Sequence, residues 1–569
     1  MMTELINEFT SEQKIAYFTM EVGLNSKMPT YSGGLGILAG DTLKSAADLA
    51  LPVVAVTILT KKGYFRQDLD IFGRQREHSE EWNPADFMMM MPHRTTVKIE
   101  GRNVLVAPWL YVIESATGGK VPVLFLDTDL EENAEQDRSI THHLYGGDDI
   151  YRLKQEIVLG IGGYNLLENL GFSIKKYHMN EGHSSLLTLQ LLKKFKKNIE
   201  DVWDERHTWD AQSVRRLCVF TTHTPVAAGH DKFSYNIVEQ VMGNEIVPLD
   251  TIKDFGGNEH LNLTLLALNL SKYVNGVAKK HKEVSRNMFP GYEIHAVTNG
   301  VHSFTWTSEP MKKLFDKYLP GWANEPEIFV RVGRIPDDEL WAAHMEAKRH
   351  LIDFLNRETQ AGMNHDTFTI GFARRATAYK RADLLFSNID RLLQIAEGRV
   401  QIVYAGKAHP RDEQGKQLIE RIFEMKERLK DRIKIAYLNN YNMDLSLKII
   451  SGVDVWLNTP LRPLEASGTS GMKAAHNGVP NFSVLDGWWI EGHIEGYTGW
   501  AIGPSAETPA DPARDADDLY YKLDHIILPM FYENRHLWIR VMQNAIGKNA
   551  YYFNSHRMMR RYVTEAYIR

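Results

Sequence analysis

Short apolar runs alternate along most of the chain with longer segments whose apolar positions recur at helical spacing. In the first half, the runs that predict buried strands are Ile15–Thr19, Val53–Leu59, Lys176–Met179, Leu217–Thr221 and Ile294–Val297. In the second half they are Phe368–Phe372, Val400–Tyr404, Ile433–Tyr437, Val453–Leu457 and Asn481–Val484. Because strands that alternate with helices are typical of βαβ units, the pattern predicts an α/β protein with parallel sheets.

Two stretches depart from this alternation. Between Phe65 and Leu126, the short apolar runs Thr96–Ile99, Val104–Ala107 and Val121–Phe125 follow one another without helices. Such strands pair antiparallel, so the stretch predicts an antiparallel insertion at about 65–126. From Ala516 to Arg569 the apolar positions keep helical spacing, which predicts a helical C-terminal segment.

Two kinds of polar residue follow the predicted strands. The first-half strands run into neutral hydrogen-bonding groups at Asn180–His183, Thr222–Thr224 and Thr298–His302. The second-half strands run into the cations Arg374, Arg375, Lys380, Arg381 and Lys407. Ligands of open α/β sheets bind beyond the carboxyl ends of the strands, so two facing sheets would enclose a sugar-like side and a phosphate-like side. At any single strand end, an ordinary polar loop explains the residues equally well.

Composition narrows the class of protein. The chain has 569 residues, 43% of them hydrophobic, and a formal net charge of −6, which indicates a folded protein without a global attraction to nucleic acid or anionic membranes. Its one cysteine, Cys218, excludes an intrachain disulfide framework and a Cys-rich zinc site, and no metal is expected. The longest apolar run, Leu49–Leu59, is too short to span a bilayer, and no secretory signal is visible. A cytoplasmic location is therefore the expectation.

Glycines precede one predicted helix. Ser32-Gly33-Gly34-Leu35-Gly36 can present backbone N–H groups to an anion, although a plain helix cap is the simpler alternative. A dinucleotide fingerprint is rejected because these glycines do not directly follow the strand Ile15–Thr19. The next strand also ends in Thr60-Lys61-Lys62, without an acidic residue for a ribose.

Cations and small residues mark two further segments. Arg374-Arg375 and Lys380-Arg381 follow one apolar strand and suit phosphate oxygens; a solvated basic face is the alternative. Glu465–Lys473 places small residues before a lysine at a predicted helix start. Such a turn can bind a phosphate, and its lysine can react with an aldehyde cofactor, but an ordinary loop is equally compatible with the residues.

The segment Glu465–Lys473, with Asn477-Gly478 and Leu485-Asp486-Gly487, closely resembles the pyridoxal-phosphate lysine segment of the α-glucan phosphorylases, the glycogen and maltodextrin phosphorylase family. Further segments resemble that family in the same order: Tyr17–Leu24 with Ser32–Ala39, Arg152–Glu156, Asn275–Ala278, Thr298–Gly300, Arg374–Arg381 and Gly406–Ala408. The resemblance runs from about residue 15 to 490. Departures such as Glu181-Gly182-His183 for Asp-x-His, and Ser470-Gly471 for Gly-Asn, concern acceptor preference more than the reaction.

The resemblance implies an α/β fold with two facing Rossmann-like domains and a deep interdomain cleft, the GT-B glycosyltransferase architecture. We expect a glucan-side domain at 1–305 with the insertion, a cofactor-side domain at 306–535, and helices at 536–569 that cross back to the first domain. The implied reaction is reversible, retaining phosphorolysis of glycogen or maltodextrin. The expected partners are α-1,4-glucan, inorganic phosphate and α-glucose 1-phosphate, without nucleic acid or membrane; a homodimer is left open.

The resemblance also implies roles for single residues. Pyridoxal phosphate is expected on Lys473, near Ser32, Arg374, Tyr441, Thr469 and Ser470. Inorganic phosphate is expected at Gly33, Gly34, Leu35, Arg375 and Lys380. Glucose is expected at His223, Asn299, Glu465, Ala466, Ser467 and Gly468, and the acceptor sugars are expected at Glu181 and His183. Glu181 is alternatively a helix cap before Ser184. The expected catalytic set is Lys473, Arg375, Lys380 and His223.

In the implied mechanism, substrate phosphate rather than a carboxyl group donates the proton to the leaving oxygen, which requires cations where two phosphates meet. Two alternatives are retained. A nucleotide-sugar-dependent glucan synthase of the same architecture would not need Lys473. A non-catalytic glucan-binding protein would lose the phosphate-binding residues, and none is lost here. A conventional aminotransferase would place its lysine in one large sheet domain with an aspartate on the cofactor's ring nitrogen, and the sequence shows no such arrangement.

Overall fold

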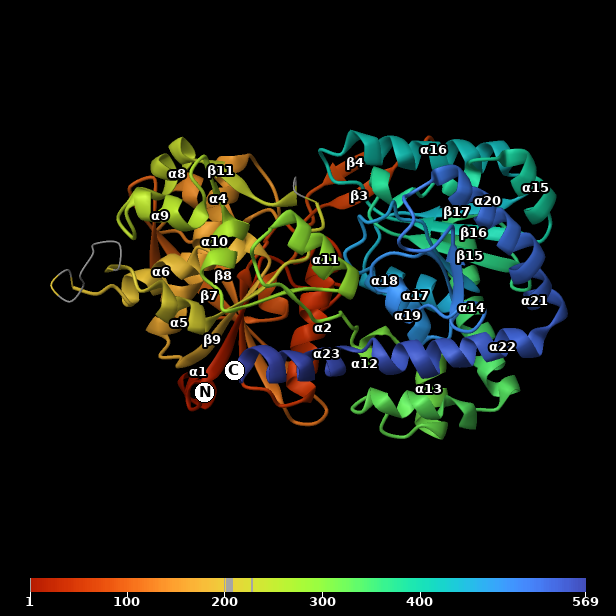
Figure 1. The fold of residues 1–569 in the computed structure, drawn as a ribbon, viewed down its shortest axis with the longest axis horizontal. Helices are drawn as coiled ribbons and strands as arrows, with labels where there is room; N and C mark the ends of the chain where they lie inside the picture. The colour runs from red at the N-terminus through yellow and green to blue at the C-terminus, as the bar shows by residue number, and fades with distance from the viewer. Residues whose placement is uncertain (1, 199, 201–207, 227–228, 569) are drawn as a thin grey trace.

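The computed structural model describes residues 2–198, 200, 208–226 and 229–568. Two sheets lie side by side along the long axis, and helices cover both faces of each (Figure 1). Each sheet is built mainly from parallel strands separated by helices. The prediction of an α/β protein with parallel sheets is therefore confirmed.

The first sheet has ten strands, in the order β14-β13-β10-β9-β1-β2-β8-β7-β5, with β6 paired to β7. The strands from β14 to β8 are parallel, whereas β7 pairs antiparallel with β5, β6 and β8. Their bounds are β1 (Lys14–Thr19), β2 (Val53–Ile58), β5 (Met89–Met90), β6 (Thr95–Ile99), β7 (Arg102–Glu114), β8 (Lys120–Asp127), β9 (Ile174–Asn180), β10 (Cys218–Thr221), β13 (Tyr273–Gly276) and β14 (His295–Ala296). A separate pair joins β11 (Lys232–Ser234) to β12 (His260–Asn262).

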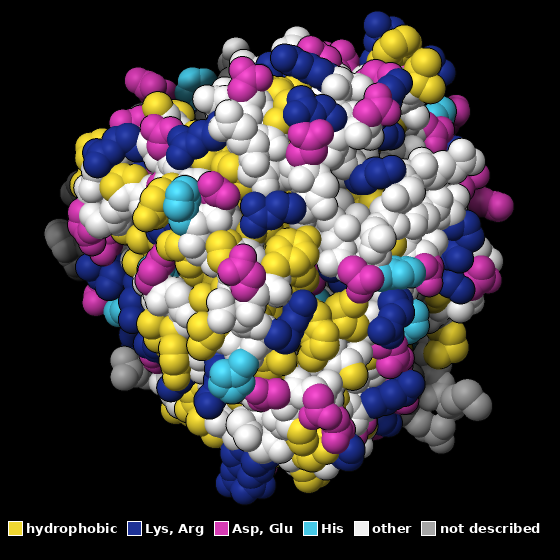
Figure 2. All heavy atoms as spheres, turned by 90° about the vertical axis from the view of Figure 1, so that its right-hand side faces the viewer, with side chains coloured by type: hydrophobic (Ala, Val, Ile, Leu, Met, Phe, Trp, Pro, Cys, Tyr) yellow, Lys and Arg dark blue, Asp and Glu magenta, His cyan; other side chains and the backbone are white. Residues whose placement is uncertain are grey.

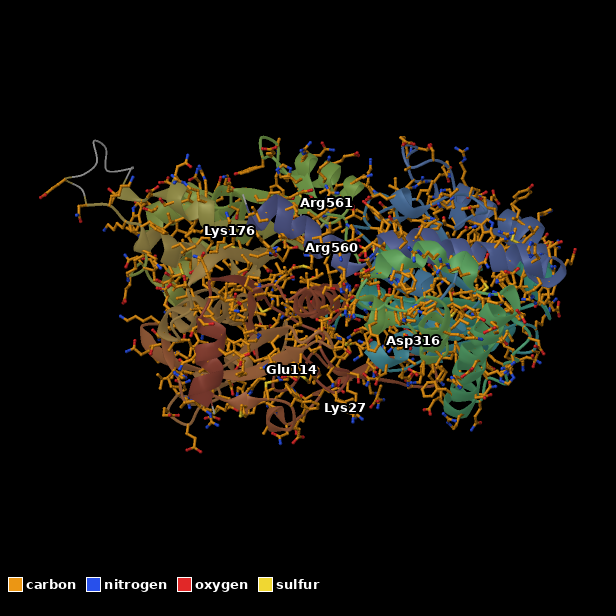
Figure 3. The ribbon with its side chains drawn as sticks, turned by 90° about the horizontal axis from the view of Figure 1, so that it is seen from below. Lys27, Glu114, Lys176, Asp316, Arg560 and Arg561 are labelled. Atoms are coloured by element: carbon orange, nitrogen blue, oxygen red, sulfur yellow. The ribbon has the colours of Figure 1, made fainter. Side chains whose placement is uncertain are left out.

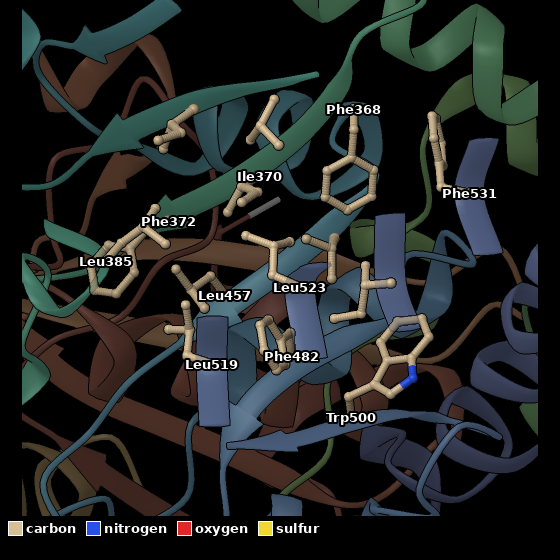
Figure 4. Packing of buried hydrophobic residues seen from close by; sticks show 14 of the residues in the cluster. Phe368, Ile370, Phe372, Leu385, Leu457, Phe482, Trp500, Leu519, Leu523 and Phe531 are labelled. Atoms are coloured by element: carbon tan, nitrogen blue, oxygen red, sulfur yellow. The ribbon is translucent and has the colours of Figure 1, made fainter. Parts of the chain in front are cut away.

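The second sheet has six parallel strands in the order β17-β16-β15-β18-β19-β20. Their bounds are β15 (Phe368–Ala373), β16 (Val400–Ala405), β17 (Lys434–Leu438), β18 (Val455–Asn458), β19 (Asn481–Val484) and β20 (Gly499–Ile502). One core fills the space between this sheet and the C-terminal helices, where Phe368, Ile370, Phe482 and Trp500 pack together (Figure 4). Burial of these apolar side chains supplies the main driving force for this half.

The helices alternate with the strands. In the first half they are α1 (Met2–Thr10), α2 (Gly34–Asp48), α3 (Glu135–Arg138), α4 (Asp149–Ile157), α5 (Gly163–Asn169), α6 (Leu187–Lys194), α7 (Ala211–Leu217), α8 (Tyr235–Met242), α9 (Leu249–Gly256), α10 (Leu263–Asn269), α11 (Lys279–Met288) and α12 (Ser303–Trp306). In the second half they are α13 (Glu309–Tyr318), α14 (Asp337–Thr359), α15 (Ile389–Ala396), α16 (Glu413–Leu429), α17 (Met443–Gly452), α18 (Thr469–His476), α19 (Trp489–Gly492), α20 (Pro512–Lys522), α21 (Leu528–Glu533), α22 (Arg535–Asn544) and α23 (Ser555–Tyr562).

The expected insertion differs from the structure at its C-terminal end. β8 pairs antiparallel with β7 but parallel with β2, opposite Ala55–Ile58, so it belongs to the main sheet. Seven consecutive residues of β8, from Val121 to Asp127, are buried, which is typical of a strand covered on both faces. The insertion also contains a hairpin, β3 (Arg66–Leu69) with β4 (Gln75–His78), that no apolar run predicted.

This hairpin joins the two halves. The side-chain amide of Gln67 donates to the carbonyl oxygen of Gly406 at 2.9 Å, and that of Gln75 donates to Ala408 at 2.9 Å. The N–H of Ala408 in turn donates to Gln75 Oε1 at 3.0 Å. Because these bonds are buried and made to backbone groups, they fix the hairpin against the loop that follows β16.

The C-terminal helices pass from one half to the other. Trp538 of α22 lies in the core of the second half, with its ring 5.7 Å from that of Phe368. The hydroxyl of Ser555, at the start of α23, lies 2.5 Å from that of Ser45 on α2. The return therefore follows η12 (Ala545–Ala550), later than the expected boundary at 536.

Within the described part of the chain, no helix is long and apolar enough to cross a membrane. Basic and acidic side chains are interspersed over the end face of the second half (Figure 2). That mixture agrees with the small net charge of the whole chain.

Candidate active site

Residues at the carboxyl ends of strands in both sheets meet at the boundary between the two halves. Lys473 of α18 interacts electrostatically with Asp41 of α2, and Arg375, two residues beyond β15, interacts with Glu21, two residues beyond β1. The site is thus assembled from two distant parts of the sequence. Among the described residues, no group of His, Cys, Asp and Glu could hold a metal ion.

The glycine loop is held by a buried carboxylate. Glu21 accepts from the N–H of Ser32 at 2.6 Å, from the N–H of Gly33 at 3.2 Å and from the hydroxyl of Tyr145 at 2.9 Å. Burial raises the pKa of Glu21, and these donors oppose that rise. A Cβ on Gly33 or Gly34 would meet no atom within 4 Å, so open space lies beside the N-terminus of α2.

Two cations meet at one buried carboxylate. Arg374 donates to Glu465 Oε1 at 2.9 Å, and Lys380 donates to Glu465 Oε2 at 2.6 Å. Burial alone would raise the pKa of Glu465, but the charges of Arg374 and Lys380 outweigh it and lower the pKa to about 2. The structure therefore brings together residues expected on the cofactor, phosphate and glucose sides. Arg374 also donates to Asn458 at the end of β18.

Arg375 differs from these two cations. Its side chain is exposed, and its electrostatic neighbours are Tyr379, Tyr64 and Glu21. In the part of the chain that the structure describes, no carboxylate forms an ion pair with Arg375. A guanidinium without a carboxylate partner among the described residues, hydrogen-bonded only to Tyr379, is available to bind an anion from solution.

Lys473 is a buried amine. It is 6% exposed, and its Nζ lies 3.7 Å from the centroid of the Trp306 ring. Burial lowers the pKa of Lys473 to about 8; Asp41 opposes this shift, whereas Lys44 and Arg374 add to it. Lys473 makes no hydrogen bond or ion pair to any described residue. Its amine is therefore easier to deprotonate than an exposed lysine, which favours reaction as a nucleophile.

The turn before Lys473 exposes polar groups. Gly468 caps α18 with φ of 88°, a left-handed conformation that favours glycine, and no side chain caps this helix. The hydroxyl of Ser467 is buried without a hydrogen-bond partner, and Ala466 and Thr469 are half-buried beside it. Ser470 accepts from Trp456 Nε1 at 3.1 Å. The first N–H groups of α18 are therefore free to bind an anion.

Two expected sugar ligands lie beyond β10 and β14. His223 Nε2 lies 2.6 Å from Asn180 Oδ1, which fixes the ring, and burial lowers the pKa of His223 to about 3. His223 is thus a neutral imidazole, suited to hydrogen bonding rather than to proton storage at pH 7. Asn299 is only 3% exposed, and its buried Oδ1 has no hydrogen-bond partner among the described residues. Such an orphaned acceptor fits a ligand hydroxyl.

Glu181 is held by donors from its own loop and from the loop after β10. Its carboxylate accepts from the N–H of His223 at 2.7 Å, the hydroxyl of Thr224 at 3.0 Å and the N–H of Gly182 at 3.3 Å. These bonds fix the loop after β10, and the bond to Gly182 is also the alternative cap. Burial raises the pKa of Glu181 to about 7. Glu181 therefore acts on His223, and its own oxygens already have donors.

Three expected residues remain, and two of them, His183 and Tyr441, have polar neighbours. His183 Nε2 lies 3.4 Å from Asp231 Oδ2, while its Nδ1 is buried without a partner. Tyr441 donates its hydroxyl to Ser446 at 2.8 Å and interacts with Arg374. Leu35 is half-buried at the start of α2.

Several residues that contact expected site residues were not predicted as site residues. Asp41, Asn458 and Trp306 carry no motif of their own. Glu21 and Asp486 lie in segments that resemble the phosphorylase family, Tyr17–Leu24 and Leu485-Asp486-Gly487, but no role was expected for either. Asp486 accepts from the N–H of Glu465 at 2.9 Å, and burial raises the pKa of Asp486 to about 7. Position was a further signal, because Asn458 directly follows a predicted strand and Glu21 and Asp486 each lie two residues beyond one.

Comparison with known proteins agrees with this site. A family model for carbohydrate phosphorylase matches residues 244–496. The chain is 40% identical to the maltodextrin phosphorylase of Thermococcus litoralis, over 98% of this chain and 70% of that protein. It is 36% identical to the glycogen phosphorylase of Aquifex aeolicus, over 98% of this chain and 87% of that protein. It is also 36% identical to the glycogen phosphorylase of Mycobacterium tuberculosis, over 97% and 70% of the two chains.

These relatives cover nearly the whole chain, including the cation cluster at Glu465, the buried Lys473 and the glycine loop. The resemblance seen in the sequence motifs is thereby confirmed. The chain belongs to the carbohydrate phosphorylase family.

Proposed function

We propose that this protein is an α-1,4-glucan phosphorylase, which transfers a terminal glucose from glycogen or maltodextrin to inorganic phosphate. The names of its relatives support α-glucan phosphorolysis. The single observation that carries the proposal is the buried, unpaired amine of Lys473 beside a cluster of cations and a free helix N-terminus. That arrangement suits a phosphate-bearing aldehyde and a second phosphate beside it.

We further propose the GT-B arrangement, with domains at about 1–305 and 306–535 and the site in a cleft between them. Support comes from contacts that span the proposed boundary. Trp306 Nε1 donates to both oxygens of Asp41 at 2.9 Å, and Lys407 donates to the carbonyl oxygen of Phe65 at 2.7 Å.

The residues fit pyridoxal phosphate. Lys473 would hold it, and the free N–H groups at Thr469 and Ser470 together with Arg374 would bind its phosphate. When bound, the cofactor supplies a phosphate group able to exchange a proton with substrate phosphate near neutral pH. The orphaned hydroxyl of Ser467 and the half-buried Tyr441 lie in the same region of the second half. Ser32 is tied to Glu21 in the glycine loop and belongs to the phosphate side.

The cations have distinct tasks in this mechanism. Arg375 binds inorganic phosphate through a guanidinium that has no carboxylate partner among the described residues, and the N–H groups of Gly34 and Leu35 at the start of α2 are further donors for it. Lys380 and Arg374 offset the charge of Glu465, so that Glu465 stays ionised and can accept bonds from sugar hydroxyls. Together these charges stabilise the negative oxygens that capture the glucosyl group.

The sugar is oriented by neutral groups. The Oδ1 of Asn299 and the imidazole of His223 accept or donate bonds to glucose hydroxyls, and Glu181 keeps His223 in place. His183 contacts Asp231 and lies on the side proposed for the acceptor sugars. None of these groups needs to change charge during the reaction, so their task is positioning.

A nucleotide-sugar-dependent glucan synthase is not favoured, because the relatives that cover nearly the whole chain are named phosphorylases. The same names disfavour a non-catalytic glucan-binding protein and an aminotransferase. The test is direct: purified protein with maltoheptaose and inorganic phosphate should form α-glucose 1-phosphate. Product that requires a nucleotide sugar, or no product with protein that binds glucan, would overturn the proposal.

A further inference from the structure

A second group of cations surrounds a hollow outside the candidate active site. The hollow has a volume of about 280 Å³ and lies beside β14, the edge strand of the first sheet. It is lined by Lys279, Lys282, Arg286, His295, Arg561 and Glu565, with Thr298 also at its wall. This volume is at the small end of the range for ligand pockets, about 300–1,000 Å³, so it suits a compact molecule.

The charge of the hollow follows from the geometry of two helical segments. Lys279, Lys282 and Arg286 are three and four residues apart on α11, so they lie on one face of that helix. Arg561 approaches from α23, where the C-terminal helices run along the first half (Figure 3). Four cations thus converge in a chain whose overall charge is negative.

The acidic groups nearby are already engaged. Glu565 accepts from Arg561 at 2.8 Å and from the hydroxyl of Tyr273 at 2.8 Å. Glu491 accepts from the N–H of Lys279 at 2.9 Å and from the hydroxyl of Thr298 at 2.9 Å. Glu293 lies 3.6 Å from the ring of His295. Lys282 has no hydrogen bond or ion pair from its side chain to any described residue, so its charge is available to a ligand.

We propose that this hollow binds a small phosphate monoester. The cations of α11 and Arg561 bind the phosphate oxygens, and the flat aromatic ring of His295, stacked on Tyr273 with centroids 4.8 Å apart, forms a wall beside the organic part. The site is separate from the proposed catalytic phosphate site, whose cations lie beyond β15.

The hollow is connected to the sugar side of the active site by a short segment. Thr298 lines the hollow, and the next residue is Asn299, whose Oδ1 is orphaned. Arg557 donates to the carbonyl oxygens of Thr298 at 2.8 Å and Asn299 at 3.0 Å. A ligand bound at Thr298 therefore contacts the same backbone segment that positions Asn299.

The experiment is calorimetric titration of glycerol 3-phosphate into the full-length protein at constant ionic strength, with glycerol as the neutral control. The wild type should bind glycerol 3-phosphate and not glycerol. Lys282→Ala with Arg286→Ala should weaken binding by at least about tenfold, since each removes a charge-assisted bond. Lys280→Ala is the matched control, because Lys280 lies on the same helix and pairs instead with Glu283 at 2.8 Å.

Arg375→Ala separates this site from the catalytic one. Binding that survives Arg375→Ala but is weakened in the Lys282/Arg286 variant supports the proposal. Absence of binding to the wild type overturns it, and so does binding that disappears in Arg375→Ala and persists in the double variant. If the double variant does not fold, Lys282→Gln should still weaken binding severalfold, and unchanged affinity there would contradict the site. None of these outcomes depends on phosphorolysis.

Discussion

The Nζ of Lys473 lies 3.7 Å from the centre of the Trp306 ring, and it makes no bond to Asp41, which accepts instead from the indole N–H. The amine therefore lies against the aromatic face of Trp306, a residue that precedes the second sheet in the sequence. A cation–π contact is weaker than a buried ion pair, so it leaves the amine able to lose its proton and react.

Arg375→Ala should lower phosphorolysis strongly and leave stability nearly unchanged. Its guanidinium is exposed and has no carboxylate partner among the described residues. Truncation of this surface side chain should therefore lower the free energy of unfolding by about 0.5 kcal/mol or less. The expected result is a rise in KM for phosphate of about tenfold or more, with glucan binding intact. Steady-state kinetics and urea unfolding measure the two effects separately.

Lys380→Ala should also lower phosphorolysis, but with a loss of stability that Arg375→Ala does not show. Lys380 lies 2.6 Å from the buried carboxylate of Glu465, and removal of one partner of a buried pair costs on the order of 3 kcal/mol. Equal stability of the two variants would contradict the pairing.

Glu465 should make stability depend on pH in the acid range. Its pKa is lowered from 4.5 to about 2, so the stabilisation is present above pH 4.5 and is lost as pH falls through that window. This lowering of the pKa corresponds to stabilisation of the folded state on the order of 3 kcal/mol. Glu465→Gln should therefore be less stable than wild type at pH 7, with a difference that shrinks toward pH 3. A difference independent of pH would show that Glu465 is not ionised in the folded state.

The pH dependence of stability due to Glu181 should have the opposite sign to that of Glu465. Burial raises its pKa from 4.5 to about 7, so its stabilising contribution is present below pH 4.5 and is lost as pH rises through 7. Glu181→Gln should gain on the order of 1–3 kcal/mol relative to wild type between pH 5 and pH 8. Denaturant unfolding of both proteins at pH 5 and pH 8 measures this difference in the free energy of unfolding.

Glu181→Ala should raise KM for maltooligosaccharide more than KM for phosphate, because Glu181 fixes the backbone of His223. Glu181→Gln keeps one acceptor and should recover most of the glucan affinity. Loss of thermal stability with unchanged KM for glucan would show that Glu181 acts only as a helix cap.

Asn299→Ala should separate function from stability. No described residue forms a hydrogen bond to the buried Oδ1 of Asn299, so its removal should leave stability unchanged or higher. The lost sugar bond should raise KM for glucan about tenfold. A loss of both stability and affinity would indicate a bond within the protein instead.

The strands with continuous apolar runs could be predicted from the sequence, because Phe368–Phe372 and Val400–Tyr404 are buried on both faces and contain few polar residues. β13 and β20 could not. β13 has only two apolar residues before Asn275, and β20 begins at Gly499, so neither has the length or composition of an isolated strand signal. Their pairing depends on neighbours already in the sheet.

The site was predictable where residues carry a motif, as at Glu465–Lys473, and unpredictable where they act on others. Glu181 illustrates this: its position after a strand was visible, but the donors that occupy its carboxylate come from the loop after a different strand, at His223 and Thr224. Trp306 likewise meets Lys473 only because α12 packs against α18. Contacts of this kind depend on the tertiary fold.

The proposed function depends on Lys473 carrying pyridoxal phosphate in a working α-glucan phosphorylase. Borohydride reduction of purified protein, followed by peptide mapping, identifies the lysine that carries it. We expect one reduced phosphopyridoxyl group per chain on the peptide containing Lys473, and none in folded Lys473→Ala. A label on another lysine, or phosphorolysis of maltoheptaose by protein that carries no label, would contradict it.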